Sequence, residues 1–329
     1  MQITGLEEHF VTTEVREAWG ALDPRWQDLS LIPSTHGATA RRLADLGDER
    51  LTAMADAGVD TQVLSLSTPG VQSLDRPEAV ALQTAANDVL SDAVHRRPDR
   101  FGGLATLATP DPSAAAAELE RAVTRLGLDG AMIFGRTRDR TMDAPEFWPI
   151  YEAAEALRAP LHLHPQTPPP AVRQAYYSGY GDRLSASFAT HGIGWHYESG
   201  IELLRLILAG VFDRFPGLQI VVGHWGELVL FYLDRIGSLD ELATLQRPIA
   251  DYFRTNVHVT PSGVLSHRYL QWAVDVIGVD RIMFATDYPF VATAKGRAQT
   301  FLREASLSDT DRAAIASGNW ARLRSAIRR

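Results

Sequence analysis

Short apolar runs alternate along this chain with longer segments whose apolar residues recur at helical spacing. The runs are predicted to form eight strands, at residues 3–9, 61–67, 101–108, 130–135, 160–164, 219–224, 254–260 and 281–287. Repeated strand–helix units of this kind are typical of a parallel sheet covered by helices. Eight units favour the α/β fold known as the (β/α)8 or TIM barrel, in which functional side chains lie at the carboxyl ends of the strands.

The segments between these strands carry the signals of helices. In one of them, apolar residues fall on a single face, at Leu82, Ala86, Val89 and Ala93. In another, Asp111 and Pro112 are a suitable N-cap and first helical residue, and the helix is expected to stop at Gly127.

Two connections are too long to be simple turns. Residues 10–47 follow the first predicted strand, and residues 166–198 follow the fifth. Long loops in a compact domain are usually functional, and both leave from the face where the active site of a barrel is expected. They are interpreted as lids or binding walls, with surface or oligomer-contact loops as the alternative.

Composition narrows the class of protein. The chain has 329 residues, 45% of them hydrophobic, which favours a single barrel domain over residues 1–329 rather than two domains. A net charge of −8 with scattered basic residues argues against nucleic acid as a partner. No apolar run approaches eighteen residues and the start lacks a signal-like segment, so we expect no membrane association and a cytoplasmic location. Without cysteine, any metal must be bound by nitrogen and oxygen.

Metal-ligand side chains lie at the ends of four predicted strands. Glu7 and His9 are two residues apart and so share one face of the first strand, whereas Glu8 points towards the surrounding helices. His164, His224 and Asp287 each end a later strand, and all these ends meet at one rim of a barrel. Carboxylates and imidazoles suit one divalent ion, Zn²⁺ or Mn²⁺, and an open coordination position would make it catalytic.

Each of these residues also has a simpler interpretation. A lone histidine near a strand end is more often a hydrogen-bonding rim or core residue than a ligand, and this interpretation is kept for His162, His196 and His258. Asp287 alone could cap a helix that follows the last strand. The coincidence of ligand-type side chains at one predicted rim favours the metal site.

Five segments, taken together, resemble the amidohydrolase-related family. They are Glu7-Glu8-His9-Phe10, residues 63–72, Leu163-His164-Pro165, Gly223-His224-Trp225-Gly226-Glu227 and Ala285-Thr286-Asp287-Tyr288-Pro289-Phe290. The resemblance runs from Leu6 to Asn319. Within this family, the segments are more specifically similar to the metal-dependent, non-oxidative decarboxylases of hydroxybenzoate-type acids. His162 and the run His196-Tyr197-Glu198 depart from the pattern of those decarboxylases.

The resemblance implies a role for each matching residue. The implied metal ligands are Glu7, His9, His164 and Asp287. Asp287 is also the implied general acid, His224 is a catalytic residue or an additional ligand, and Glu227 supports His224.

Five further residues are candidates for substrate binding. Phe10, Trp225, Tyr288 and Phe290 flank the ligands in sequence and are interpreted either as apolar walls or as packing. Arg235 matches an arginine that some relatives present near a neighbouring subunit's site, with an ordinary surface residue as the alternative. The relatives suggest a homodimer or homotetramer.

The implied function is a metal-dependent, non-oxidative decarboxylase. Its substrate would be a small aromatic acid with a hydroxyl group ortho to the carboxylate, and Asp287 would protonate the ring carbon before carbon dioxide leaves. A metal-dependent hydrolase of a lactone, amide or ester would use the same residues. An inactive barrel that acts as a binding protein is the third interpretation.

Overall fold

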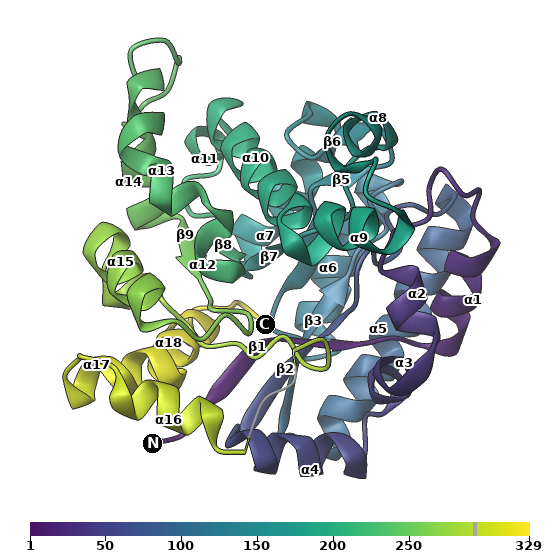
Figure 1. Cartoon of the computed structure of the whole chain (residues 1–329), viewed down its shortest axis with the longest axis horizontal. Coiled ribbons are helices and arrows are strands. Elements are labelled where there is room, and N and C mark those ends of the chain that lie inside the picture. Colours follow the sequence, from purple (N-terminus) through teal and green to yellow (C-terminus); the bar gives the residue numbers. More distant parts are fainter. Residues whose placement is uncertain (292–294) are drawn as a thin grey trace.

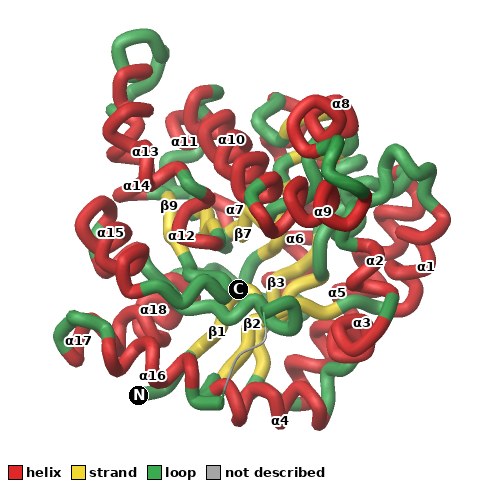
Figure 2. Tube along the Cα trace, in the orientation of Figure 1, coloured by secondary structure: helices red, strands yellow, loops and turns green. Residues whose placement is uncertain are grey.

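The computed structural model describes residues 1–291 and 295–329. Seven parallel strands form one curved sheet with the order β1-β2-β3-β4-β7-β8-β9. Figure 2 shows these strands in the middle of the molecule, with helices around them. Their bounds are Thr4–Phe10 (β1), Thr61–Leu66 (β2), Phe101–Thr106 (β3), Ala131–Phe134 (β4), Leu161–His164 (β7), Ile220–Val222 (β8) and Val257–Val259 (β9).

The eighth predicted strand is not regular, although its segment closes the barrel. The Met283 amide donates to the Val259 carbonyl at 2.9 Å on one side, and the Leu6 amide donates to the Phe284 carbonyl at 3.0 Å on the other. Residues 282–288 therefore lie between β9 and β1, joined to them by isolated bridges. Asp287 has a φ of 60°, which turns the chain out of the extended conformation and ends any continuous ladder. The predicted barrel is confirmed, and the prediction of a regular strand at 281–287 is wrong.

Helices follow the strands around the outside of the barrel (Figure 1). The helices that lie between or after the strands are Asp48–Ala57 (α4), Arg76–Arg96 (α5), Pro112–Thr124 (α6), Trp148–Leu157 (α7), Gly194–Leu208 (α10), Val211–Arg214 (α11), Val229–Ile236 (α13), Ile249–Thr255 (α14) and His267–Ile277 (α15). Arg297–Glu304 (α16), Asp309–Ala313 (α17) and Asn319–Ser325 (α18) complete the chain. As predicted, Asp111 caps α6, accepting from the Ala114 amide at 3.1 Å. In α5 the apolar face is shifted, because Leu90 is buried where Val89 was expected, and Val89 is exposed.

The two long connections are largely helical rather than simple loops. Residues 10–47 contain Thr13–Ala21 (α1), Leu31–Thr35 (α2) and Gly37–Ala44 (α3). Residues 166–198 contain Pro170–Val172 (α8), Asp182–Ser187 (α9) and the first turn of α10. A small hairpin, Arg136–Thr137 (β5) with Arg140–Thr141 (β6), follows β4 and was not predicted. Within the described residues, no helix combines the length and apolarity needed to cross a bilayer.

An apolar layer fills the barrel below its polar rim. Its members come from most of the strands and from α18, and they are Leu6, Val63, Leu104, Met132, Phe134, Val221, Met283 and Trp320. Side chains alternate along a strand, so a layer of this kind raises the next inward-facing residues to the carboxyl ends. On β1 the register shifts between Gly5 and Glu8, and this irregularity lets Glu7 follow the inward-facing Leu6 directly and lie with His9 at the carboxyl end.

Glu202 of α10 makes stability depend on pH. Burial, with smaller help from Glu198, raises the pKa of Glu202 from 4.5 to about 8. The folded protein therefore keeps this proton between pH 4.5 and 8 while the unfolded chain loses it, so stability falls as pH rises through that window. Between pH 5 and 9 this group is expected to lower the free energy of unfolding of the wild type by on the order of 4 kcal/mol. Glu202→Gln should not show this decrease.

Urea denaturation at pH 5, 7 and 9 measures this effect. Glu120→Gln, at an exposed position of α6, is the matched control and should follow the wild-type profile. Parallel pH profiles for wild type and Glu202→Gln would contradict the assignment.

Candidate metal centre

Glu7 lies at the centre of the predicted site. Its side chain is fully buried, and its two oxygens each lie 3.1 Å from an imidazole Nε2, Oε1 from His164 and Oε2 from His162. The Ser262 hydroxyl donates to Oε2 as well. Burial acts to raise the pKa of Glu7, but the surrounding histidines, His224 foremost, outweigh it and hold the pKa well below its ordinary value. Glu7 is therefore an ionised carboxylate in the interior, ready to accept a cation.

His9 and His164 each direct towards this carboxylate a ring nitrogen that donates no hydrogen bond to any described residue. His164 Nδ1 donates to the Pro165 carbonyl at 2.8 Å, which leaves Nε2 as the lone-pair nitrogen, the tautomer that a metal ligand needs. The rings of His9 and His164 are 4.8 Å apart, and one donor atom each from Glu7, His9 and His164 can be chosen within 4.8 Å of one another. Within the described chain, Glu7 Oε1 and both ring nitrogens of His9 are buried without a hydrogen bond. Buried polar atoms normally have partners, so this donor set fits a divalent ion.

Asp287 joins the group from the segment next to β1, where the barrel closes. Its Oδ1 lies 3.4 Å from His9 Nε2, in line with its place on the segment that joins β1. Burial, and then repulsion from Glu7, raise the pKa of Asp287 well above its ordinary value. The structure thus brings together the four predicted ligands, Glu7, His9, His164 and Asp287, while their role as ligands stays a prediction.

A second cluster lies beside the first, in a segment with unusual backbone geometry. His224 through Leu228 all have positive φ, including the four non-glycine residues His224 (47°), Trp225 (63°), Glu227 (53°) and Leu228 (69°). Such conformations are costly and tend to occur at functional sites. Here they place His224 Nδ1 2.8 Å from Glu227 Oε1, so that His224 Nε2 faces Glu7 at 3.9 Å.

The charges of this second cluster are strongly coupled. Burial lowers the pKa of His224, but Glu227 and Glu7 outweigh it and raise the pKa to about 10. Burial also opposes ionisation of Glu227, yet His224 and His196 hold its pKa at about 2. The pair is therefore an imidazolium and a carboxylate across the neutral range, before any metal charge is added.

Sequence reasoning missed three residues of the site. His162 was interpreted as a rim residue, but it contacts Glu7; its position two residues before His164 on one strand was the available signal. His196 was given the same interpretation, but its Nδ1 lies 2.8 Å from Glu227 Oε2. Ser262 was not considered, because it follows β9 in a turn with a φ of 39° that no local pattern indicates. His258, in contrast, lies away from this cluster and contacts Gln219 at 3.2 Å.

Glu8 is held by side chains of neighbouring strand segments, on the side where Arg50 of α4 bonds to Gln62. It is fully buried and accepts from the Gln62 side chain at 2.8 Å and from the amide and hydroxyl of Thr286 at 2.8 and 2.6 Å. Burial raises the pKa of Glu8 to about 7. Through Thr286, Glu8 fixes the segment that carries Asp287 against β1.

The predicted substrate-binding residues lie in different places. The Phe290 ring meets the His9 ring at 5.5 Å, so Phe290 borders the site. Phe10 is buried in the main hydrophobic core, Tyr288 packs under the guanidinium of the buried Arg50, and the Trp225 indole donates to the Val264 carbonyl at 2.6 Å. Arg235 is exposed on α13.

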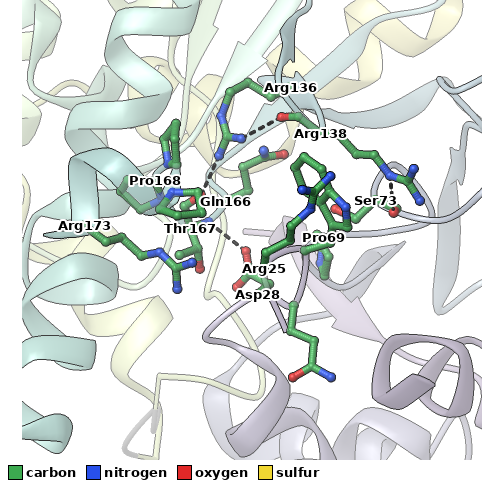
Figure 3. A pocket seen from close by; sticks show the side chains of 14 residues that line it. Arg25, Asp28, Pro69, Ser73, Arg136, Arg138, Gln166, Thr167, Pro168 and Arg173 are labelled. Atoms are coloured by element: carbon green, nitrogen blue, oxygen red, sulfur yellow. Dashed lines mark hydrogen bonds between the residues drawn. The ribbon is translucent and has the colours of Figure 1, made fainter. Parts of the chain in front are cut away.

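A pocket rich in arginine lies where the chain leaves the metal centre. Figure 3 shows Arg25, Arg136, Arg138 and Arg173 around it, with Asp28 the one acidic side chain among its lining residues. Gln166 and Thr167, which also line it, come directly after His164 and Pro165. The guanidinium of Arg136 is held by Glu198 and by the Thr167 carbonyl, both at 2.5 Å. Arg138 is paired with Asp75 at 2.8 Å, so acidic partners offset much of the positive charge around this pocket.

Comparison with known proteins places this site in a family. The amidohydrolase family model matches residues 9–323, and the chain belongs to that family. Gamma-resorcylate decarboxylase of Polaromonas sp. JS666 is 35% identical, over 95% of this chain and 95% of its own.

Solved structures agree with this assignment. The crystal structure of 5-carboxyvanillate decarboxylase from Sphingomonas paucimobilis has a TM-score of 0.90 and 35% identity, covering 98% of this chain and 99% of that one. The dihydroxybenzoic acid decarboxylase of Polaromonas sp. JS666, with bound manganese and the inhibitor 2-nitroresorcinol, has a TM-score of 0.86 and 32% identity, covering 98% and 97%. These relatives confirm the predicted family and the predicted enzyme class, a carboxy-lyase of the amidohydrolase superfamily. The manganese in the neighbouring structure agrees with the prediction of one divalent ion.

Proposed function

We propose that this chain is a metal-dependent, non-oxidative decarboxylase of an aromatic acid that carries a hydroxyl group ortho to its carboxylate. The observation that carries the proposal is a buried set of bare ligand atoms facing Asp287, in a chain whose relatives are decarboxylases of such acids.

Glu7, His9, His164 and Asp287 are the residues that would hold the ion. A divalent metal at this position supplies Lewis-acid polarisation to the oxygens of the bound acid. His162 and Ser262 fix the Glu7 carboxylate, and the Pro165 carbonyl fixes the ring of His164, so the donors are oriented in advance.

Asp287 and His224 both take part in the proton transfer to the substrate. Before any metal charge is added, burial favours the protonated Asp287 carboxyl, and this carboxyl is the group that donates to the ring carbon bearing the carboxylate. That carbon becomes tetrahedral, the bond to the carboxylate then breaks, and carbon dioxide leaves as the ring regains aromaticity. His224, held at Nδ1 by Glu227, presents its Nε2–H to the negative charge that appears on Asp287 when it gives up its proton.

The test is turnover by the manganese- or zinc-loaded protein. A panel of ortho-hydroxybenzoates is followed by loss of ultraviolet absorbance together with release of bicarbonate, and lactones and anilides are tested in parallel. Decarboxylation of at least one acid supports the proposal. Cleavage of lactones or anilides without decarboxylation would establish the hydrolase instead, and inactivity towards all of them with bound metal would favour the binding protein.

We also propose that residues 1–329 form one domain that assembles as a homodimer or homotetramer in the cytoplasm. Strand segments from Thr4 to 288 belong to one barrel, which supports a single domain. Figure 1 shows α13 and the loop after it projecting from the body of the molecule. This region carries an exposed aromatic patch, made of Phe231, Tyr232, Tyr269 and Trp272, and the exposed Leu228 precedes α13.

The aromatic patch predicts where the copies meet. Phe231 is 64% exposed, and its ring lies 5.2 Å from that of Trp272. Arg235 is one helical turn after Phe231 and shares its face, so a copy seated there would contact Arg235 as well. We expect the double variant Phe231→Ser/Trp272→Ser to shift the protein from oligomer to monomer in light scattering. Ile32→Ser, at another exposed apolar residue, should leave the mass unchanged; an unchanged mass for the double variant would place the interface elsewhere.

A further inference from the structure

His196 shares the carboxylate of Glu227 with His224. Glu227 Oε1 accepts from His224 Nδ1 and Oε2 accepts from His196 Nδ1, both at 2.8 Å. The two imidazole rings are 4.4 Å apart. Glu227 itself is buried, so its two oxygens are divided between these two histidines rather than solvated.

This arrangement determines where His224 points. With one partner alone, the carboxylate of Glu227 can rotate about its last torsion, which is broad for a glutamate. A second donor on the other oxygen fixes the plane of the carboxylate and therefore the direction of the His224 Nδ1–H bond. The backbone of residues 224–228, with positive φ throughout, lacks the hydrogen-bonded regularity of a helix that would otherwise hold these side chains.

His196 also connects the catalytic histidine to the 166–198 connection. It lies in the first turn of α10, whose Glu198 binds Arg136 at 2.5 Å, and Arg136 in turn binds the Thr167 carbonyl at the start of that connection. Arg136 thus joins the two ends of the connection, at Thr167 and Glu198, and His196 joins the second end to Glu227. The side chain of His196 is 16% exposed, so it lies at the border of the site rather than in the core.

We propose that His196 is a positioning residue that orients His224 through Glu227 and makes this orientation depend on the ordered 166–198 connection. The proposal rests on the proposed function, because it assigns His196 a part in that reaction. His196 acts on the turnover step, and not on the metal, because its ring contacts Glu227 and His224 but none of Glu7, His9, His164 and Asp287.

Three variants of the metal-loaded protein test this role. In His196→Asn, the side-chain amide nitrogen lies near the place of Nδ1 and can still donate to Glu227, whereas His196→Leu keeps the volume without a donor. His191→Leu, at an exposed histidine of the same connection, is the matched control. We expect His196→Leu to lower kcat about 10–100-fold with little change in KM, His196→Asn to recover most of it, and His191→Leu to match wild type.

A measurement that needs no turnover keeps this proposal separable from the proposed function. The Nδ1–H proton of His224, assigned by its absence in His224→Gln, is followed by NMR in each variant. A signal that persists in wild type and His196→Asn but broadens through exchange in His196→Leu supports the positioning role, even if no acid on the panel is decarboxylated. Wild-type kcat and an unchanged signal in His196→Leu would overturn it. So would a second equivalent of bound metal that is lost in His196→Leu, because His196 would then be a ligand.

Discussion

Replacing Asp287 by asparagine is expected to lower kcat for decarboxylation by about 10²–10⁴-fold, the range that positioned general acids contribute. Asparagine keeps the shape of the side chain and an oxygen near His9, but it has no acidic proton to give to the ring carbon. In the wild type, burial and the charge of Glu7 favour the protonated form of Asp287. Its Oδ1 is 3.4 Å from His9 Nε2, so the proton is held at the edge of the ligand cluster.

Initial rates with the best acid of the panel, at saturating metal, measure this effect. Bound metal is determined on the same samples by plasma mass spectrometry, since Asp287 is also a predicted ligand. Asp92→Asn, at an exposed position of α5, controls for the loss of one carboxylate and should keep wild-type rates. If Asp287→Asn bound a full equivalent of metal and retained its kcat, the proton would have to come from another group, with His224 the nearest candidate.

Much of the barrel could be predicted because its strands are defined by local patterns. The apolar runs at 61–67 and 101–108 become β2 and β3 almost residue for residue. The segment 281–287 has the same apolar pattern, but isolated bridges rather than a continuous ladder join it to β9 and β1, and the chain turns away at the left-handed Asp287. That conformation depends on contacts with β1, including the bonds from Thr286 to Glu8, which lie 278 residues apart in sequence.

The residues of the site likewise fall into those that local sequence patterns predict and those that only the tertiary structure places. The spacing of Glu7 and His9 on one strand, and the terminal position of His164 on another, follow from a period of two and could be predicted. Trp225 could not be placed by such reasoning, because the positive φ values from His224 onward turn its indole towards the Val264 carbonyl. His196 reaches Glu227 through the path of a long connection, which tertiary packing decides.

Glu7→Gln is expected to have the largest effect on metal binding. The substitution keeps the size of the side chain but removes the one carboxylate that lies among His162, His164 and His224. In the wild type this carboxylate is ionised far into the acidic range, because the histidines hold its pKa well below the ordinary value despite burial. A dication bound to an amide oxygen there would lose its closest negative charge.

We therefore expect Glu7→Gln to weaken metal affinity by more than about 100-fold, beyond the 10–100-fold loss typical of an outer hydrogen-bond partner. His162→Phe is the matched comparison, because His162 contacts Glu7 Oε2 without belonging to the ligand cluster of Glu7, His9 and His164. It should keep a full equivalent of metal at saturation and lose affinity only within that smaller range. Competition with a chelator measures both affinities, and circular dichroism confirms that each variant is folded. If His162→Phe lost more metal than Glu7→Gln, His162 would be a ligand and the cluster would have to be redrawn around it.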